Sequence, residues 1–347
     1  MRILISGNLG YVGAALTKYL RKKYPDAYLI GFDNAYFASC LTGDVVPESL
    51  LNEQHYGDIR YSFYNYPFSG KIDTVIHLSA ISNDPIGKLN EKFTFDINTE
   101  SSIRLAKWAR YYGVKNFIFA SSCSVYGFAE NGEELNEESK VNPLTSYAKS
   151  KVKTEEGLKE LANNNFKVTC LRFATACGWS DRTRLDLVVN DFVASALTTG
   201  EIHIQSNGKP WRPIIDVQDM ARAMDWAMNR TTGENYEIVN AGGKDCNLTV
   251  QEIARWVQCA IPKTKVFIND YAPEDKRSYK VNFDKFYKLA EEEYLPKTDL
   301  CKSIIHLIKG LQDIKYKESQ KSNLIRLDKI IKLQEQGLLN NNLEWIR

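Results

Sequence analysis

Short apolar segments alternate with amphipathic ones over the first half of the chain. Apolar segments with the length of buried strands lie at Arg2–Ser6, Ala27–Phe32, Thr74–Leu78, Asn116–Ala120 and Lys167–Phe173. Apolar residues spaced three and four apart predict helices at Tyr11–Lys22, Glu91–Tyr112 and Ser146–Leu161. Because strands that alternate with long helices form βαβ units, the pattern predicts an α/β protein with a doubly wound parallel sheet.

The pattern loosens after about Gly178, where shorter elements alternate with loops. Helices are predicted near Asp186–Thr198, Asp219–Met228 and Val250–Cys259, and strands near Ile202–Gln205 and Tyr236–Val239. We expect residues 1–178 to form one domain. Residues 179–347 are expected to form a smaller lobe with C-terminal helices, and some of its elements should return to the first domain. A last predicted helix, Ser322–Gln336, has one apolar face and should pack on the body of the protein.

Composition excludes several classes of protein. The chain has 347 residues, with 45 Lys and Arg against 43 Asp and Glu, which gives a net charge of +2. This balance lacks the positive surplus that nucleic acids or anionic membranes attract, so we expect neither partner. No apolar run approaches the roughly 20 residues of a membrane helix, and the first residues, MRILISGNLG, do not resemble a secretory signal. The seven Cys form no CxxC pair and the four His form no i,i+4 pair. We therefore expect no metal site, no disulfide framework and a cytoplasmic location.

The first predicted strand runs into GNLGYVG, which places Gly7, Gly10 and Gly13 between a strand and a helix. Gly7 can make the tight turn, Gly10 lets the backbone approach a diphosphate, and Gly13 lets the helix pack against the strand. The N–H groups at the start of the helix, where Tyr11 lies, can then bind phosphate oxygens. The motif therefore predicts a dinucleotide site in a Rossmann-type sheet.

Asp33 follows the second predicted strand, twenty residues after Gly13. A carboxylate at this place accepts hydrogen bonds from the adenosine ribose and repels a 2′-phosphate, which favours NAD over NADP. The next residue, Asn34, is a further candidate NAD contact, and no Arg stands beside Asp33 to bind such a phosphate. The alternative is that Asp33 caps a turn together with Asn34. We assign Asp58 and Ile59 to the adenine side of the same site.

Tyr147 and Lys151 are four residues apart in one predicted helix, so their side chains share a face. A Lys ammonium lowers the pKa of a nearby phenol from its usual value of about 10, which suits Tyr147 to take a proton from a carbinol while hydride leaves to NAD. The same YxxxK spacing occurs at Tyr19 and Tyr111, which we interpret as structural. What distinguishes Tyr147 is Ser122, which follows a predicted strand at the edge where open parallel sheets bind ligands.

Several motifs follow one another along the chain. They are the GxxGxxG turn, the Asp after the second strand, HLSA (residues 77–80), SSCSVYG (121–127), YAKSK (147–151) and LRFATACG (171–178). Together they resemble the extended short-chain dehydrogenase/reductases, and within them the NAD-dependent nucleotide-sugar epimerases and dehydratases. The resemblance covers about residues 1–310. It implies a Rossmann-type domain followed by a smaller substrate-binding lobe.

The resemblance also assigns residues. It implies catalytic roles for Ser122, Tyr147 and Lys151. It implies NAD contacts at Gly7, Gly10, Gly13, Asp33, Asp58, Ile59, Leu78, Ser79, Ala80, Asn98 and Lys151. In the second lobe it implies diphosphate contacts at Asn190 in LVVNDFV (187–193), Arg212 in SNGKPWRPIIDVQD (206–219) and Arg277 in KRSY (276–279). A guanidinium pairs with phosphate through charge-assisted hydrogen bonds. The alternative for both Arg residues is a solvated surface position.

The chain departs from the pattern of the 4,6-dehydratases, which carry Asp-Glu directly before VYG. Here Cys123 and Ser124 take those positions, which disfavours the removal of water. Thr175 stands where epimerases often have Asn, Pro213 follows the Arg in place of Asp, and Glu100 replaces a Gly. We keep Cys123, Ser124 and Thr175 as candidate sugar contacts, although a small packed thiol explains Cys123 better.

The expected protein is a cytoplasmic, NAD-dependent epimerase that oxidises C4 of a nucleotide-diphosphate sugar, in glycan or surface-polysaccharide precursor synthesis. A net C4 dehydrogenase or 4-keto reductase would use the same residues, and a 4,6-dehydratase is disfavoured. A non-catalytic NAD-binding regulator on the same fold is a remote alternative, because fold alone does not prove activity. The intact Ser–Tyr–Lys set argues against it. The helices at 91–112 and 146–161 resemble the pair through which the family dimerises, which implies a homodimer.

Overall fold

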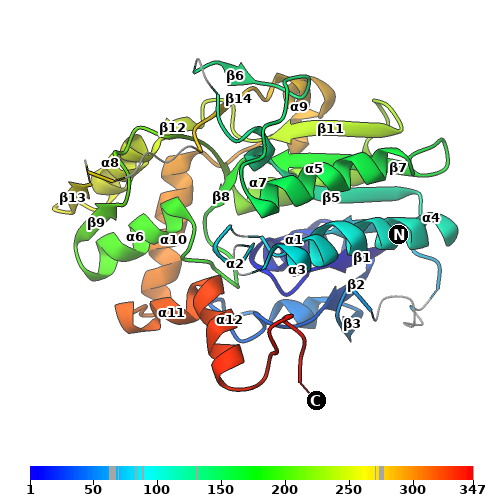
Figure 1. Cartoon of the computed structure of the whole chain (residues 1–347), viewed down its shortest axis with the longest axis horizontal. Coiled ribbons are helices and arrows are strands. Elements are labelled where there is room, and N and C mark those ends of the chain that lie inside the picture. The colour runs from blue at the N-terminus through cyan, green and yellow to red at the C-terminus, as the bar shows by residue number, and fades with distance from the viewer. Residues whose placement is uncertain are drawn as a thin grey trace.

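The computed structural model describes residues 1–61, 68, 70–82, 84–87, 90–129, 132–269, 271–272 and 277–346. A seven-stranded sheet forms the centre of the first lobe, in the order β11-β7-β5-β4-β1-β2-β3, and each neighbouring pair is parallel (Figure 1). Its strands are β1 (Arg2–Ser6), β2 (Tyr28–Asp33), β3 (Glu53–Tyr56), β4 (Thr74–His77), β5 (Asn116–Ser122), β7 (Lys167–Phe173) and β11 (Tyr236–Ala241). The prediction of a Rossmann-type parallel sheet is confirmed.

The central strands are continuous apolar runs because helices cover both faces of the sheet. In β1, Ile3 and Ile5 pack into the same core as α1 (Tyr11–Lys23) and α7 (Val217–Asn229). The intervening Leu4 points to the other face, where α3 (Glu91–Phe95), a π-helical turn (Asp96–Glu100), α4 (Ser101–Tyr111) and α5 (Ser146–Lys159) lie. All three β1 side chains are fully buried.

The second lobe has its own core and three small sheets. These contain β8 (Thr175–Cys177), β10 (Trp211–Asp216) and β12 (Asn247–Thr249); β9 (Glu201–Ile204) and β13 (Lys265–Ile268); and β6 (Glu134–Leu135) and β14 (Lys280–Val281). The helices α6 (Val188–Thr198), α8 (Val250–Ala260) and α10 (Leu300–Asp313) pack around this core, and α9 (Asp284–Leu289) lies against β11. The lobe therefore sits beside the carboxyl ends of the central strands (Figure 1).

The chain returns to the first lobe at its end. After α11 (Lys321–Leu324), α12 (Arg326–Glu335) and the last described residues lie near β2 and β3 (Figure 1). Ile330, Leu333, Leu339 and Leu343 are buried in the same core cluster as Leu4 of β1. The C-terminal segment is therefore built into the dinucleotide-binding half of the fold.

Some elements differ from the sequence prediction. The predicted helix Glu91–Tyr112 contains the π-helical turn, and the predicted helix Ser322–Gln336 is interrupted at Ile325, whose backbone is extended. The strand β3, with the sequence EQHY, was not predicted because its polar residues show no apolar alternation at the edge of the sheet. Short helices at α2 (Asp84–Gly87) and in 3₁₀ turns complete the fold. Within the described ranges, no helix combines the length and apolar character that a membrane crossing requires.

Candidate active site

A cavity of about 880 Å³ runs along the carboxyl ends of the central strands and is walled by both lobes. One part is lined by the glycine turn before α1, and another by Arg212 and Arg277 of the second lobe. Ser122, Tyr147 and Lys151 also line it. Ligands of open α/β sheets bind at this edge, so the cavity is the candidate active site.

The glycine turn leaves room for a diphosphate. Gly7 has φ +79°, and a Cβ atom there would lie 2.6 Å from the backbone nitrogen of Ser79. A Cβ atom at Gly13 would lie 2.3 Å from the carbonyl oxygen of Gly7. Gly10 caps α1 without a side chain, so the first N–H groups of the helix, from Tyr11 onward, are available to an anion. The geometry therefore fits the diphosphate of a dinucleotide.

Asp33, at the end of β2, lines the same part of the cavity. One carboxylate oxygen accepts the N–H of Leu9 at 3.1 Å, and the other accepts the N–H of Ala35 at 2.8 Å. Burial raises the pKa of Asp33, while these backbone donors oppose the rise. The residue thus caps a turn, as the alternative prediction had it, and also presents its carboxylate to the cavity.

Four other predicted NAD contacts lie outside the cavity lining. Asp58 is ion-paired with Arg60 at 2.6 Å, and Ile59 is buried in the core. The amide oxygen of Asn34 accepts from the N–H of Tyr36. Asp58 and Ile59 were predicted at the adenine side of the site. Neither they nor Asn34 contribute a side chain to the cavity lining.

Asn98, the fourth, occupies the π-helical turn and is buried. Its amide bonds both backbone groups of Ile81, with the N–H of Ile81 at 2.8 Å and its carbonyl oxygen at 3.0 Å, and also donates to the hydroxyl of Ser150 at 3.0 Å. Residues 78–80, which do line the cavity, precede Ile81 directly. Asn98 therefore fixes the loop after β4 to α5. The resemblance indicated the residue, but the contact is with the protein itself.

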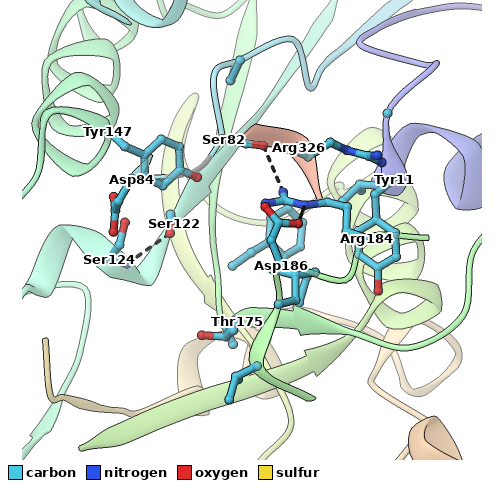
Figure 2. A pocket seen from close by; sticks show the side chains of 18 of the residues that line it. Tyr11, Ser82, Asp84, Ser122, Ser124, Tyr147, Thr175, Arg184, Asp186 and Arg326 are labelled. Atoms are coloured by element: carbon cyan, nitrogen blue, oxygen red, sulfur yellow. Dashed lines mark hydrogen bonds and ion pairs between the residues drawn. The ribbon is translucent and has the colours of Figure 1, made fainter. Parts of the chain in front are cut away.

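The predicted catalytic side chains meet at the carboxyl end of β5. The Ser122 hydroxyl oxygen accepts the N–H of Ser124 at 3.1 Å (Figure 2), and this hydroxyl is close enough to Tyr147 to act on its pKa. Thr145 caps the start of α5 through the N–H of Ala148, which fixes the helix turn that carries Tyr147. A hydroxyl pair of this kind can bind the oxygen of a carbinol or ketone.

The expected lowering of the Tyr147 pKa by Lys151 is not found. Burial raises the pKa of Tyr147 to about 12; the hydrogen bond with Ser122 and the charge of Arg184 oppose this, and the charge of Asp84 adds to it. The Lys151 ammonium lies 5.5 Å from the centre of the Tyr147 ring and donates to the carbonyl oxygen of Ala120 at 2.7 Å. Burial in turn lowers the pKa of Lys151 to about 7. Desolvation therefore dominates the pKa of both groups.

Sequence reasoning missed several polar groups on the cavity wall. Arg184 is buried, forms a two-point ion pair with Asp186 at 2.9 Å and donates to Ser82 at 3.1 Å (Figure 2). Asp84 and Arg326 also line the cavity. The charged run DRTRLD at residues 181–186, placed where the strand pattern loosens, was the available indication for Arg184.

The predicted sugar contacts divide between the wall and the core. Ser124 and Thr175 line the cavity. Cys123 does not: its buried thiol donates to the carbonyl oxygen of Arg172 at 3.1 Å, and burial raises its pKa well above the usual value. These contacts favour the packed-thiol alternative for Cys123 over a sugar contact. All seven cysteines are free thiols.

Asn190 is also placed away from the cavity lining. Its buried amide accepts the N–H of Gly178 at 3.0 Å and donates to the carbonyl oxygen of Arg184 at 2.9 Å. The side chain therefore holds the loop that carries Arg184. In this geometry it has no free group for a diphosphate, and the predicted direct contact is not supported.

Arg212 and Arg277 line the cavity together. Arg277 is ion-paired with Asp84 at 2.8 Å, and its side chain is 47% exposed. Arg212 donates to the carbonyl oxygen of Arg277. The two cations are therefore close together and partly solvated at the second-lobe end of the site.

The parallel sheet, the glycine turn, Asp33 and the Ser–Tyr–Lys set define a Rossmann-type enzyme of the extended short-chain dehydrogenase/reductase class. Residues 3–242 match the model of the NAD dependent epimerase/dehydratase family, and the chain belongs to that family. NAD is the cofactor of the family and hence of this chain, as predicted.

Named relatives catalyse different reactions. The chain is 25% identical over 326 residues to UDP-glucose 4-epimerase from Lacticaseibacillus casei, which covers 84% of this chain and 95% of the relative. It is 25% identical over 312 residues to dTDP-D-glucose 4,6-dehydratase from Mus musculus, with 85% of each chain covered. The solved structure of MoeE5 in complex with UDP-glucose and NAD has a TM-score of 0.75 at 20% identity, covering 90% of this chain and 99% of that one. The last similarity shows a shared fold, so the choice of reaction depends on this chain's own site.

Proposed function

We propose that the chain is an NAD-dependent 4-epimerase of a nucleotide-diphosphate sugar, in glycan or surface-polysaccharide precursor synthesis in the cytoplasm. One observation carries the proposal. A single continuous cavity is lined by the glycine turn, by the hydroxyl-bearing side chains of Ser122 and Tyr147, and by Arg212 and Arg277. This order suits a dinucleotide, a reacting sugar carbon and a second diphosphate.

The reacting carbon is a secondary alcohol at C4. NAD, held by the glycine turn and Asp33, would supply a reversible hydride acceptor for this carbon. Tyr147 takes the C4 hydroxyl proton and later gives it back, so no proton or electron pair is lost over the cycle. The Ser122 oxygen accepts from Ser124, and its O–H remains a donor that can turn from Tyr147 to the same sugar oxygen. The charge of Arg184 lowers the pKa of Tyr147 and so favours the phenolate that this step requires.

The sugar diphosphate is assigned to Arg212 and Arg277. Each can form charge-assisted hydrogen bonds with phosphate oxygens. Arg277 must exchange its ion pair with Asp84, and its partial exposure makes this exchange inexpensive. The sugar end of the cavity can then hold a diphosphate while the 4-keto sugar turns to present its other face.

Elimination of water from the sugar is a second candidate reaction, because Asp84 contributes a carboxylate to the cavity lining. One of its oxygens is buried and has no hydrogen-bond partner among the described residues. Its charge also acts on Tyr147, so the two groups face the same space. A carboxylate beside a 4-keto sugar can remove an acidified proton from the neighbouring carbon. Cys123 and Ser124 offer no such base.

The test is to incubate the purified protein with UDP-, dTDP-, GDP- and CDP-sugars and analyse products by chromatography and mass spectrometry. Epimerisation gives a new peak of unchanged mass. A loss of two hydrogens with NADH formed would establish a net dehydrogenase instead. A loss of water would favour the Asp84 candidate. Turnover of 4-keto sugars alone, with NADH consumed, would identify a reductase.

We further propose a homodimer formed through α4 and α5, which pack together on one face of the sheet. The exposed positions of α5 include Lys149, Lys153 and Glu156. Since both charge signs are present, pairing between two copies should weaken with salt. Light scattering should give a dimer mass at low salt and a smaller mean mass at 1 M salt. A monomer at every concentration and salt would contradict the dimer.

A further inference from the structure

The C-terminal segment, residues 326–346, is seated on the loops that follow β2 and β3. The Trp345 indole N–H donates to the carbonyl oxygen of Asn34 at 2.7 Å, and the Tyr36 hydroxyl donates to the carbonyl oxygen of Leu343. Asn34 directly follows Asp33, the predicted ribose ligand. The segment is therefore attached to the wall of the dinucleotide end of the cavity.

The same segment is also attached to the loop after β3. Arg60 donates to the carbonyl oxygen of Asn342 at 2.8 Å while its guanidinium is paired with Asp58. The Tyr61 hydroxyl donates to Glu344 at 2.8 Å. Asp58 and its neighbours were predicted at the adenine side. The last residues of the chain thus bridge two loops that are more than 280 residues away in sequence.

Arg326, the first residue of α12, reaches from this segment into the cavity. The residue is 3% exposed, lines the cavity and lies with its guanidinium carbon 4.6 Å from the centre of the Phe37 ring. One guanidinium nitrogen donates to the carbonyl oxygen of Arg182 at 3.1 Å. The other terminal nitrogen, Nη1, is buried without a hydrogen-bond partner among the described residues. A buried donor of this kind is costly unless a ligand satisfies it.

The charge of Arg326 is also unbalanced. Its two cationic neighbours each have a carboxylate: Arg184 is paired with Asp186 at 2.9 Å, and Arg182 with Glu48 at 2.7 Å. The described contacts give Arg326 no such partner. Burial, with the charges of Arg184 and Arg182, lowers its pKa to about 10, while Cys40 and the more distant charge of Asp186, which is itself paired with Arg184, oppose the shift. A buried, unpaired cation beside two others is an arrangement that an anion stabilises.

The position of Arg326 in the cavity indicates which of two diphosphates it binds, that of the dinucleotide or that of the sugar nucleotide. In Figure 2, the Arg326 side chain lies beside Arg184, whose charge acts on it, and Tyr11, the first residue of α1, lines the same cavity. Asp33 and Gly10 line the same end of the cavity, whereas Arg212 and Arg277 belong to the second lobe. We propose that Arg326 binds the diphosphate of the dinucleotide from the side opposite the start of α1, and that residues 326–346 act as a clamp that retains the cofactor between turnovers. This rests on NAD binding but not on the proposed sugar reaction.

The first test measures binding and not turnover. Arg326→Met should raise the Kd of the NAD-free protein for NAD by about 10- to 100-fold in calorimetric titration, because a charge-assisted pair is lost. Binding of adenosine, which has no phosphate, should stay unchanged. Lys332→Met is the matched control, since it removes a cation from an exposed position of the same helix. Equal NAD affinity in Arg326→Met and wild type would overturn the proposal.

UDP separates the two possible diphosphate sources. If Arg326 served the sugar nucleotide, Arg326→Met would weaken UDP binding and leave NAD binding intact, which would contradict the clamp. The wild-type protein supplies a second measurement that does not depend on how the variant folds. NAD should slow amide hydrogen exchange in residues 326–346, and UDP should not. Unchanged exchange in this segment on addition of NAD would also contradict the clamp.

Discussion

The two ends of the cavity are built by different means. At the dinucleotide end, backbone atoms approach each other so closely that Gly7 and Gly13 have no room for a side chain. At the sugar end, long side chains are paired with one another: Arg277 with Asp84, and Arg212 with the carbonyl oxygen of Arg277. The dinucleotide end is fixed by the path of the main chain, whereas the sugar end is held by side-chain pairs that can exchange their partners.

This difference explains why the cofactor is easier to assign than the sugar. A backbone cradle tolerates few alternatives, because any added atom displaces main chain. Partly exposed side chains can be replaced or can re-pair at little cost to the fold. Substitutions in the glycine cradle should therefore affect folding and NAD affinity together, whereas those at the sugar end should act on substrate binding and turnover and leave the fold intact.

The largest effect is expected between the two ends, at Tyr147. Tyr147→Phe should lower kcat by about 10²- to 10⁴-fold, since it removes the proton acceptor, while calorimetry shows unchanged NAD affinity. Tyr19→Phe is the matched control, because Tyr19 has the same YxxxK spacing but donates to Asp225 at 2.9 Å, away from the cavity lining. Full activity in Tyr147→Phe would remove the proposed base.

The glycines offer a direct comparison within the cradle. Gly13→Ala places a Cβ atom 2.3 Å from the carbonyl oxygen of Gly7 and should destabilise the fold by roughly 1–3 kcal/mol. At Gly10 the nearest atom to a Cβ is that same oxygen at 3.2 Å, so Gly10→Ala should weaken NAD binding with less loss of stability. Thermal unfolding and NAD titration of both variants separate the two effects. Equal melting temperatures for both variants would show that the close approach at Gly13 is unimportant.

Lys151 should make stability depend on pH. Its folded pKa of about 7 lies below the usual 10.5, so the unfolded chain binds more protons between these values and stability rises with pH across that window. From pH 7 to pH 9 the gain is about 2 kcal/mol for this one group. Urea unfolding should show the gain in wild type and its loss in Lys151→Met. The same slope in both proteins would mean that Lys151 is not held in a desolvated state.

The smallest predicted effect is at the sugar end. The Asp84 carboxylate raises the pKa of Tyr147, so Asp84→Asn should lower it. More phenolate is then present at a given pH, and the acidic limb of the kcat/KM profile should move to lower pH by about half a unit to one unit. Asp245→Asn, at an exposed position of the second lobe, is the control. A limb that moves to higher pH would show that Asp84 acts on turnover in another way.

Local patterns predicted the dinucleotide end well. The bounds of β1 and the start of α1 follow from an apolar run that meets a glycine turn, and the structure places both as expected. Ser122 and Tyr147 were brought together because each sits at a predictable element end. These features depend on residues close in sequence, where periodicity and turn chemistry are informative.

The contacts that the sequence did not reveal join distant segments. Arg326 meets Arg182 across 144 residues and reaches the cavity from a helix whose pattern predicts only packing. Asn190 and Asn98 were recognised by motif, yet their amides bind the protein's own backbone. A lowering of the Tyr147 pKa by Lys151 was expected from charge alone, but burial raises that pKa to about 12. Desolvation is set by the complete fold and is not visible in a local pattern.

The most direct test of the account follows a deuterium atom placed at C4 of whichever nucleotide-diphosphate sugar the product assay identifies. If Tyr147 and Ser122 act at C4 and the hydride returns there, the epimeric product keeps deuterium at C4, and unlabelled sugar turned over in D2O gains no deuterium at C5. Nuclear magnetic resonance and mass spectrometry of the product give both values. Deuterium found at C6 of a dehydrated sugar, or in released NADH, would contradict the proposed epimerase.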